Sequence, residues 1–212
     1  MSTFLNDVRY GLRMLSKSPG FTFIAVFALA LGIGANTTIF SLINGLLLRP
    51  LVGVDEPERL VAVYTSDYSS GLYGSSSYPD YADFREETTA FEGLAAYTEA
   101  VASLTGSDNE PLRLRGESVT GNFFKVLGVR AAAGRTLLPE DERTASGNPV
   151  VVISHNLWQR RFNFDPTLVG RTITLDGRAH TVVGIAAENF RGLHLGMPPE
   201  FWQPMPPPEN NP

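Results

Sequence analysis

The hydrophobic pattern divides the chain into a short amphipathic segment, a long apolar segment and a mixed remainder. Residues 21–48 carry no charge and are almost continuously apolar. As an α-helix these 28 residues would extend roughly 42 Å, whereas about 20 residues suffice to cross the hydrocarbon core of a bilayer. The pattern therefore predicts a transmembrane helix over residues 21–48.

The segment before this helix has apolar and basic residues on opposite sides. Its apolar residues recur at helical spacing, at Phe4, Val8, Leu12 and Leu15. Its basic residues fall on the other side of the same helix, at Arg9, Arg13 and Lys17. Residues 1–20 are therefore predicted to form an amphipathic helix on the cytoplasmic face of the membrane, with a bend at Ser18-Pro19-Gly20.

A cleaved secretory signal is the alternative for this region. Basic residues precede the apolar run, and small residues near Gly32 could form a cleavage site. The run, however, continues to Leu48, well beyond such a site, which favours an uncleaved anchor. Three basic residues precede the helix and only Arg49 and Arg59 closely follow it, so the N-terminus is expected in the cytoplasm of a cell with an inner membrane, and the remainder in the periplasm.

One ridge of the apolar helix consists of small residues. They are Gly34, Thr38, Ser41 and Gly45, spaced at i, i+4, i+7 and i+11. Small residues on one ridge allow another membrane helix to approach closely, so these four residues are the candidate helix-packing site, with a homodimer as one arrangement. The alternative is that the ridge only faces lipid.

The remaining residues predict an α+β fold, with residues 49–197 as an extracytoplasmic mixed α/β domain. Strands are expected at residues 60–65, 94–104, 111–119, 150–153, 171–175 and 178–185. Helices are expected at residues 78–88, 123–127 and 155–164, packed on one side of a mixed sheet. Loops are expected at residues 66–77, where a partner-contacting tip is the functional alternative, and at residues 134–149.

Two further local signals lie near the C-terminus. Asp176-Gly177 matches the two-residue turn that joins antiparallel strands in a hairpin. Residues 198–212 contain seven prolines and are expected to be a loose tail, because proline cannot occupy a strand or helix interior.

Charge and residue types exclude several functions. Fourteen of the 17 basic and 21 of the 22 acidic residues follow the apolar segment, which gives that part a net charge of −7 and argues against nucleic acid as a partner. There is no cysteine, so the external domain has no disulfides. The sequence contains no GxxxxGK[ST] phosphate loop and no GxSxG motif.

Candidate catalytic and metal-binding residues are few. The only histidines are His155, His180 and His194, which have no metal-site spacing. Two acidic pairs could in principle act as acid and base, namely Asp80 with Asp83 and Glu140 with Asp141, although carboxylates at helix starts are far commoner. The sequence therefore predicts no enzyme activity, no metal and no cofactor.

Several long segments resemble a known family, the MacB-like or FtsX-like permeases of ABC transporters. The segments are NDVRYGLRMLSKSPGFTFIAVFALALGIGANTTIF from Asn6, SYPDYADFREETTAFEGLAAY from Ser77, GNFFKVLGVRAAAGRTLLPEDE from Gly121, VVISHNLWQRRF from Val151 and DPTLVGRTITLDGRAHTVVGIA from Asp165. The first is similar to the family's N-terminal amphipathic and membrane helices, and the others to its periplasmic core domain.

The resemblance implies a non-enzymatic permease component of an export or mechanotransmission complex. Such permeases work in pairs with a separate or fused cytoplasmic ATPase, which drives motion of the external domain. The family has three further membrane helices and a coupling segment after this domain, which this chain does not include, so an incomplete fragment is expected. A free-standing membrane-anchored periplasmic binding or adaptor protein is the alternative, and a secreted enzyme is a third.

Overall fold

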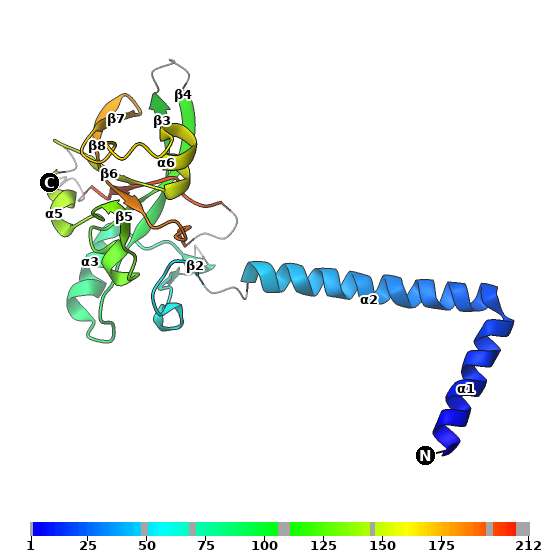
Figure 1. Cartoon of the computed structure of the whole chain (residues 1–212). Helices are drawn as coiled ribbons and strands as arrows, with labels where there is room; N and C mark the ends of the chain where they lie inside the picture. Colours follow the sequence, from blue (N-terminus) through cyan, green and yellow to red (C-terminus); the bar gives the residue numbers. More distant parts are fainter. Residues whose placement is uncertain are drawn as a thin grey trace. The chain divides into compact units, whose positions relative to one another are not determined.

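The computed structural model describes residues 2–47, 51–67, 71–105, 111–144, 147–193 and 197–206 (Figure 1). Its contacts divide the chain into two compact units, Met1–Arg49 and Pro50–Pro212. The first unit consists of two helices, α1 (Ser2–Lys17) and α2 (Pro19–Leu47). The second unit contains a mixed sheet with short helices around it, and the fold class is α+β, with one N-terminal apolar helix preceding the sheet-rich domain.

The second unit alternates between strands and short helices. Its elements in chain order are η1 (Pro57–Arg59), β1 (Thr65–Asp67), β2 (Gly71–Gly74), α3 (Tyr78–Glu87), β3 (Tyr97–Thr105), β4 (Pro111–Val119), α4 (Phe123–Val126), β5 (Ala131–Gly134), α5 (Pro139–Thr144), β6 (Val150–Ile153), α6 (His155–Phe162), β7 (Thr172–Leu175), β8 (Arg178–Ala186) and β9 (Phe201–Pro204). β1 and β2 form a separate antiparallel pair.

The main sheet closes on itself. Its strand order is β5-β8-β6-β9-β4-β3-β7, and β7 also pairs with β8. Six strands therefore form a closed ring. β5 is not part of this ring and pairs with the C-terminal half of β8, for example Ala131 with Ala186. The ring is mixed, because β4 and β9 are parallel, as are β6 and β8, whereas the other neighbours are antiparallel. Closure leaves no free edge within the ring.

One hydrophobic cluster fills this ring. It takes buried side chains from all six strands, together with Leu157 of α6 and Leu168. A second cluster lies on the other face of β6 and β9, where Val152 and Trp202 pack with Phe123 and Phe124 of α4. Successive residues of a strand point to opposite faces, so α4 and α6 cover different faces. The expectation that the helices pack on one side of the sheet is therefore wrong.

The predicted loose tail contains a central strand. β9 lies between β4 and β6, and Phe201 and Trp202 are fully buried. The prolines flank the strand instead of interrupting it. Pro204, which has no N–H, is its last residue, and the next residue continues the pairing, since Met205 N donates to Val119 O at 2.7 Å. The expectation for residues 198–206 is thus wrong, and residues 207–212 lie outside the described residues.

Other local expectations have mixed outcomes. The strand expected over residues 60–65 is wrong, because only Thr65 joins a strand, and the loop expected over residues 66–77 contains the rest of β1 and all of β2. The loop expected over residues 134–149 contains α5. The strand expected at residues 94–104 begins at Tyr97 instead. The predicted strands at 111–119 and 150–153 and the predicted helix starts at Tyr78, Phe123 and His155 are confirmed.

The Asp176-Gly177 hairpin is confirmed by its backbone. Asp176 and Gly177 have φ of 49° and 75°, the positive values that a two-residue hairpin turn needs. The turn also bonds to β3, because Ser103 N donates to Asp176 Oδ1 at 2.7 Å and Asp176 N donates to Ser103 O at 3.0 Å. The hairpin thereby fixes the register at which β7 meets β3.

Gly116 makes room for the central aromatic residue of the ring. It pairs with Phe201 across β4 and β9, and a Cβ at Gly116 would lie 2.5 Å from the Phe201 ring. No side chain can occupy that position unless β9 moves or the ring rotates away. Gly116 is therefore a packing requirement of the strand that completes the ring.

Gly116→Ala is expected to destabilise the external domain by about 1–3 kcal/mol, because the added methyl group overpacks the Phe201 ring. The measurement is denaturant unfolding of the full chain in detergent, followed by tryptophan fluorescence. In the double variant Gly116→Ala with Phe201→Leu, the alanine should cost less than it does alone, since the smaller side chain relieves the clash. Equal costs in both backgrounds would contradict the packing argument.

Candidate helix-packing site

α2 is long and apolar enough to cross a membrane. Its span Pro19–Gly45 comprises 27 residues with a mean hydropathy of 2.0, and it is the one such helix in the part of the chain that the structure describes. Its large side chains are exposed to the surroundings, for example Phe23 at 72% and Phe40 at 64%. A helix that is apolar on all sides and has no protein packed around it suits a lipid environment.

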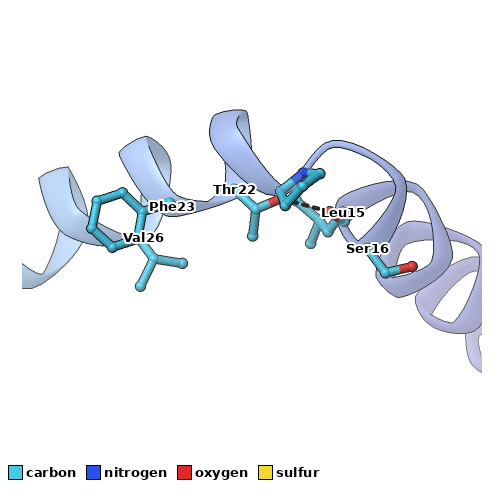
Figure 2. A pocket seen from close by; sticks show the side chains of 6 residues that line it. Leu15, Ser16, Thr22, Phe23 and Val26 are labelled. Atoms are coloured by element: carbon cyan, nitrogen blue, oxygen red, sulfur yellow. Dashed lines mark hydrogen bonds between the residues drawn. The ribbon is translucent and has the colours of Figure 1, made fainter.

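The two helices of the first unit are joined by a short polar bend. α2 begins at Pro19, whose missing N–H costs nothing in the first helical turn. The Thr22 hydroxyl donates to the carbonyl oxygen of Leu15 at 2.7 Å, an oxygen near the end of α1 (Figure 2). Ser18 Oγ also donates to Met14 O, at 3.2 Å. These side chains bind carbonyl groups near the end of α1, where the helix itself no longer supplies every N–H donor.

One side of this bend is a shallow apolar groove. Its lining comes from the end of α1 and the first two turns of α2, namely Leu15, Ser16, Pro19, Thr22, Phe23 and Val26 (Figure 2). The groove is open, and its apolar lining is continuous with the apolar surface of α2. It has no convergent set of polar groups for a small ligand.

The predicted helix-packing residues lie on one open face of α2. Gly34, Thr38, Ser41 and Gly45 fall within an arc of about 60° on a helix of 3.6 residues per turn. Gly34, Thr38 and Ser41 are exposed and Gly45 is half-buried, and a Cβ added at Gly34 or Gly45 would meet no atom within 4 Å. The ridge extends toward the N-terminus along a groove lined by Phe27, Ala30, Leu31, Gly34 and Ala35.

The polar group of Thr38 is satisfied within its own helix. Its hydroxyl donates to Gly34 O at 2.8 Å, the local bond that threonine commonly makes in helices. The hydroxyl therefore needs no partner helix. What the ridge offers is a surface without large side chains, on which the backbone of a second helix can approach closely.

Of the first acidic pair, Asp80 binds the backbone at the start of α3. Asp80 Oδ2 accepts hydrogen bonds from Ser77 Oγ at 2.7 Å and from Ser77 N at 3.0 Å, and these bonds lower the pKa of Asp80. Asp80 N in turn donates to Ser77 Oγ, so the two residues form a capping box for α3. Asp83 is an exposed residue of the same helix. This geometry is that of a helix start.

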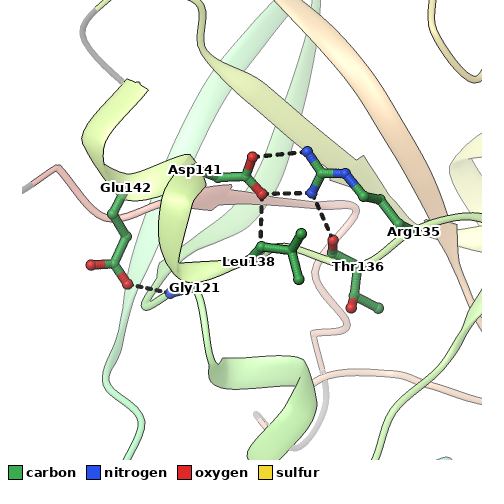
Figure 3. Close-up of polar contacts among 6 residues, drawn as sticks. All are labelled: Gly121, Arg135, Thr136, Leu138, Asp141 and Glu142. Atoms are coloured by element: carbon green, nitrogen blue, oxygen red, sulfur yellow. Dashed lines mark hydrogen bonds and ion pairs between the residues drawn. The ribbon is translucent and has the colours of Figure 1, made fainter.

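Of the other acidic pair, Asp141 binds Arg135, the residue that follows β5 (Figure 3). Asp141 is 6% exposed and accepts from both terminal nitrogens of Arg135, at 2.7 and 2.8 Å, and from Leu138 N at 2.8 Å. The hydrogen bonds to Asp141 raise the pKa of Arg135. Glu142 accepts from Gly121 N. Glu140 is exposed beside them, so the predicted pair has one buried member bound to arginine and one in solvent.

The histidines do not converge. His155 packs against Trp158 and Phe164, with ring centroids 5.6 and 5.4 Å away. His180 is buried on β8, with Nδ1 3.0 Å from Arg178 O. His194 lies outside the described residues. Among the described residues, no group of three or more histidine and acidic side chains is placed to hold a metal ion.

Sequence reasoning missed a buried carboxylate on β4. Glu117 is 1% exposed, and Trp202 Nε1 donates to its Oε2 at 2.7 Å. A carboxylate is buried only where such bonds compensate for lost hydration. The bond joins β4 to β9 through side chains as well as through the backbone. One signal was present in the sequence, an acidic residue in a strand whose C-terminal half is otherwise uncharged.

Sequence reasoning also missed an exposed aromatic pair beside β1 and β2. Tyr64 is 55% exposed and Tyr73 is 78% exposed, and their rings meet edge to face at 5.4 Å. Val61 and Val63 next to them are also exposed. The predicted strand over residues 60–65 would have buried one side of this run.

Comparison with known proteins identifies the family. The model of the MacB-like periplasmic core domain matches residues 22–206. The chain belongs to this family. It is 33% identical over 113 residues to the macrolide export ATP-binding/permease protein MacB of Hahella chejuensis, a match that covers 49% of this chain and 17% of that protein. The chain therefore spans about a sixth of the length of this relative.

Two solved structures are also similar to this chain. The periplasmic region of MacB from Actinobacillus actinomycetemcomitans is 18% identical, with a TM-score of 0.47, over 59% of this chain and 54% of that one. The extracellular domain of the ABC-type transporter YknZ from Gram-positive bacteria is 16% identical, with a TM-score of 0.47, over 59% of this chain and 60% of that one. The family assignment rests on the match to residues 22–206.

Helix packing on the ridge can be tested by cysteine cross-linking, because the chain has no cysteine of its own. Ser41→Cys is expected to form disulfide-linked dimers in membranes, whereas Asn36→Cys, on the opposite side of α2, is not. Adding Gly34→Leu and Gly45→Leu should lower the Ser41→Cys dimer yield by roughly fivefold, which corresponds to about 1 kcal/mol of helix contact. Equal yields from both faces, or no effect of the leucines, would mean that the ridge faces lipid.

Proposed function

We propose that this chain is a non-enzymatic permease component of an ABC-type export or mechanotransmission complex. The observation that carries the proposal is the direct succession of a helix able to span a membrane and a MacB-like periplasmic core domain. A membrane helix joined to an external domain can pass movement from one side of the membrane to the other. The cell inner membrane is the expected location.

In this proposal α2 crosses the membrane once, with the N-terminus in the cytoplasm. The basic residues Arg9, Arg13 and Lys17 precede the helix, which favours this orientation. α1 lies on the cytoplasmic face, and the bend at Ser18 turns the chain into the membrane. The domain from residue 50 onward is then periplasmic, in agreement with the name of its family.

Two partners complete the proposal. A cytoplasmic ATPase subunit supplies the energy, because the sequence has no phosphate loop of its own. A second membrane helix, from another copy of this chain or from a partner subunit, packs on the ridge that contains Gly34 and Gly45. The external domain acts by position and movement. Its buried acidic residues have structural roles, because Glu117 binds Trp202 and Asp141 binds Arg135.

The topology can be tested with reporter fusions after Pro212. A reporter that is active only outside the cytoplasm is expected to be active, and one that is active only inside is expected to be silent. Replacing Arg9, Arg13 and Lys17 together by Gln should reduce the outside signal, because these residues set the orientation. The mature chain should retain Met1 or Ser2. A mature N-terminus near Leu31 would show a cleaved signal and overturn the anchor.

The role of the chain can be tested by an ATP hydrolysis assay. The full chain alone in lipid vesicles is expected to release no phosphate from ATP above the rate of empty vesicles. A cytoplasmic ATP-binding subunit from the same cells should co-purify with it from cross-linked membranes. ATP hydrolysis by the chain alone would contradict the proposal, and an anchored chain that captures only periplasmic proteins would support the binding or adaptor alternative.

A further inference from the structure

The first unit carries a basic surface on α1, close to the bend that leads into α2. Arg9, Arg13 and Lys17 recur at i, i+4 and i+8, so they lie within an arc of about 80° on the helix. All three are exposed, and among the residues that the structure describes none forms an ion pair or a side-chain hydrogen bond with them. Asp7 is the only acidic residue before Asp55 in the sequence. The surface therefore carries uncompensated positive charge.

The apolar groove at the bend begins where this basic surface ends. Ser16 lines the groove, directly precedes Lys17, and donates from its hydroxyl to Arg13 O at 2.9 Å. Arg13 and Lys17 therefore lie within one helical turn of the entrance of the groove. Arg9 is seven residues from Ser16, which is about 10 Å along the helix axis. The charge closest to the groove thus comes from Arg13 and Lys17.

The groove changes from polar to apolar along its length. The hydroxyl groups of Ser16 and Thr22 lie at the bend, whereas Phe23 and Val26 line the part that follows α2 (Figure 2). Val26 is seven residues after Pro19, which places it about 10 Å further along the axis of α2. A polar entrance beside positive charge, followed by an apolar channel, matches the two ends of a phospholipid.

The shape of the lining favours a lipid chain over a second helix. Membrane helices pack closely where small residues line the contact, as on the ridge that contains Gly34. The lining of the groove includes instead the large side chains of Leu15, Phe23 and Val26, and the Phe23 ring is 72% exposed. These side chains keep a second helix backbone at a distance, whereas a flexible acyl chain can follow the uneven surface between them.

The proposed function, on which this inference rests, sets the depth of the bend. If α2 enters the membrane at Pro19 with α1 on the cytoplasmic face, the bend lies at the level of the lipid headgroups. Basic residues next to a membrane helix attract anionic headgroups on that face. A zwitterionic headgroup gains less, because its own cation already accompanies the phosphate. We infer that the bend binds one anionic phospholipid, whose phosphate contacts Arg13 and Lys17 and whose acyl chain lies along the groove.

The inference can be tested by quenching of a tryptophan on either side of α2. Full chains carrying Phe23→Trp or Phe21→Trp are reconstituted in vesicles of equal parts phosphatidylglycerol and phosphatidylcholine, with brominated acyl chains on one lipid or the other. Phe21 is a matched control, because it is 70% exposed, does not line the groove and lies about 160° around α2 from Phe23. The signal of the native Trp158 and Trp202 is measured on the unsubstituted chain and subtracted. The ratio of quenching by brominated phosphatidylglycerol to quenching by brominated phosphatidylcholine is expected to be about twofold or more higher at Phe23→Trp.

Removal of the charge next to the groove should abolish this lipid preference. Arg13→Gln with Lys17→Gln is expected to bring the quenching ratio at Phe23→Trp down to the ratio at Phe21→Trp. Lys17→Gln alone should lower it more than Arg9→Gln, which removes the same charge further from the groove, beyond a Debye length of about 8 Å. Equal ratios at the two probes, or equal effects of the two single variants, would overturn the site and leave a general attraction of α1 to anionic lipid.

A third probe separates this inference from the proposed function. Phe40 is 17 residues after Phe23, about 25 Å along α2, so Phe40→Trp should be quenched equally by both brominated lipids whenever α2 is in the bilayer. If neither lipid quenches Phe40→Trp, the membrane anchor and the proposed function fail. If Phe40→Trp is quenched and Phe23→Trp shows no preference for phosphatidylglycerol, only the lipid site is overturned. Quenching of Phe21→Trp without quenching of Phe23→Trp would mean that a protein segment fills the groove, which would also overturn the site.

Discussion

Closure of the sheet by β9 is the constraint on which the external domain depends. Without this strand, β4 and β6 would each expose an unpaired edge, and both hydrophobic clusters would open, because Phe201 belongs to one and Trp202 to the other. The strand is held by backbone pairing on both sides and by the bond from Trp202 Nε1 to Glu117. Gly116 supplies the space that the Phe201 ring needs.

This closure restricts how the domain can deform. A closed ring with a filled interior has few ways to deform, so a force applied at one strand moves the whole unit. The ion pair of Arg135 with Asp141 fixes α5 next to β5, which pairs with β8 of the ring.

The two units follow different physical rules. In the domain, apolar side chains are buried in two clusters, and the backbone N–H and C=O groups of the strands form hydrogen bonds with one another. In α2, the backbone is satisfied within the helix and the apolar side chains remain exposed, which is stable only in lipid or against other helices. The ridge containing Gly34 and Gly45 is the surface of α2 on which another helix could pack closely.

The sequence alone determined the features that depend on local periodicity and turn chemistry. The uncharged run of α2, the starts of the helices at Tyr78 and His155 and the Asp176-Gly177 turn could all be read directly, because each is set by residues within a few positions. The family resemblance was equally readable, since its motifs are long and ordered. Only the tertiary structure decided the role of residues 201–204, the burial of Glu117 and the exposure of Tyr64. A short strand between prolines has no periodic signal, and its stability comes from partners more than 40 residues away in the sequence.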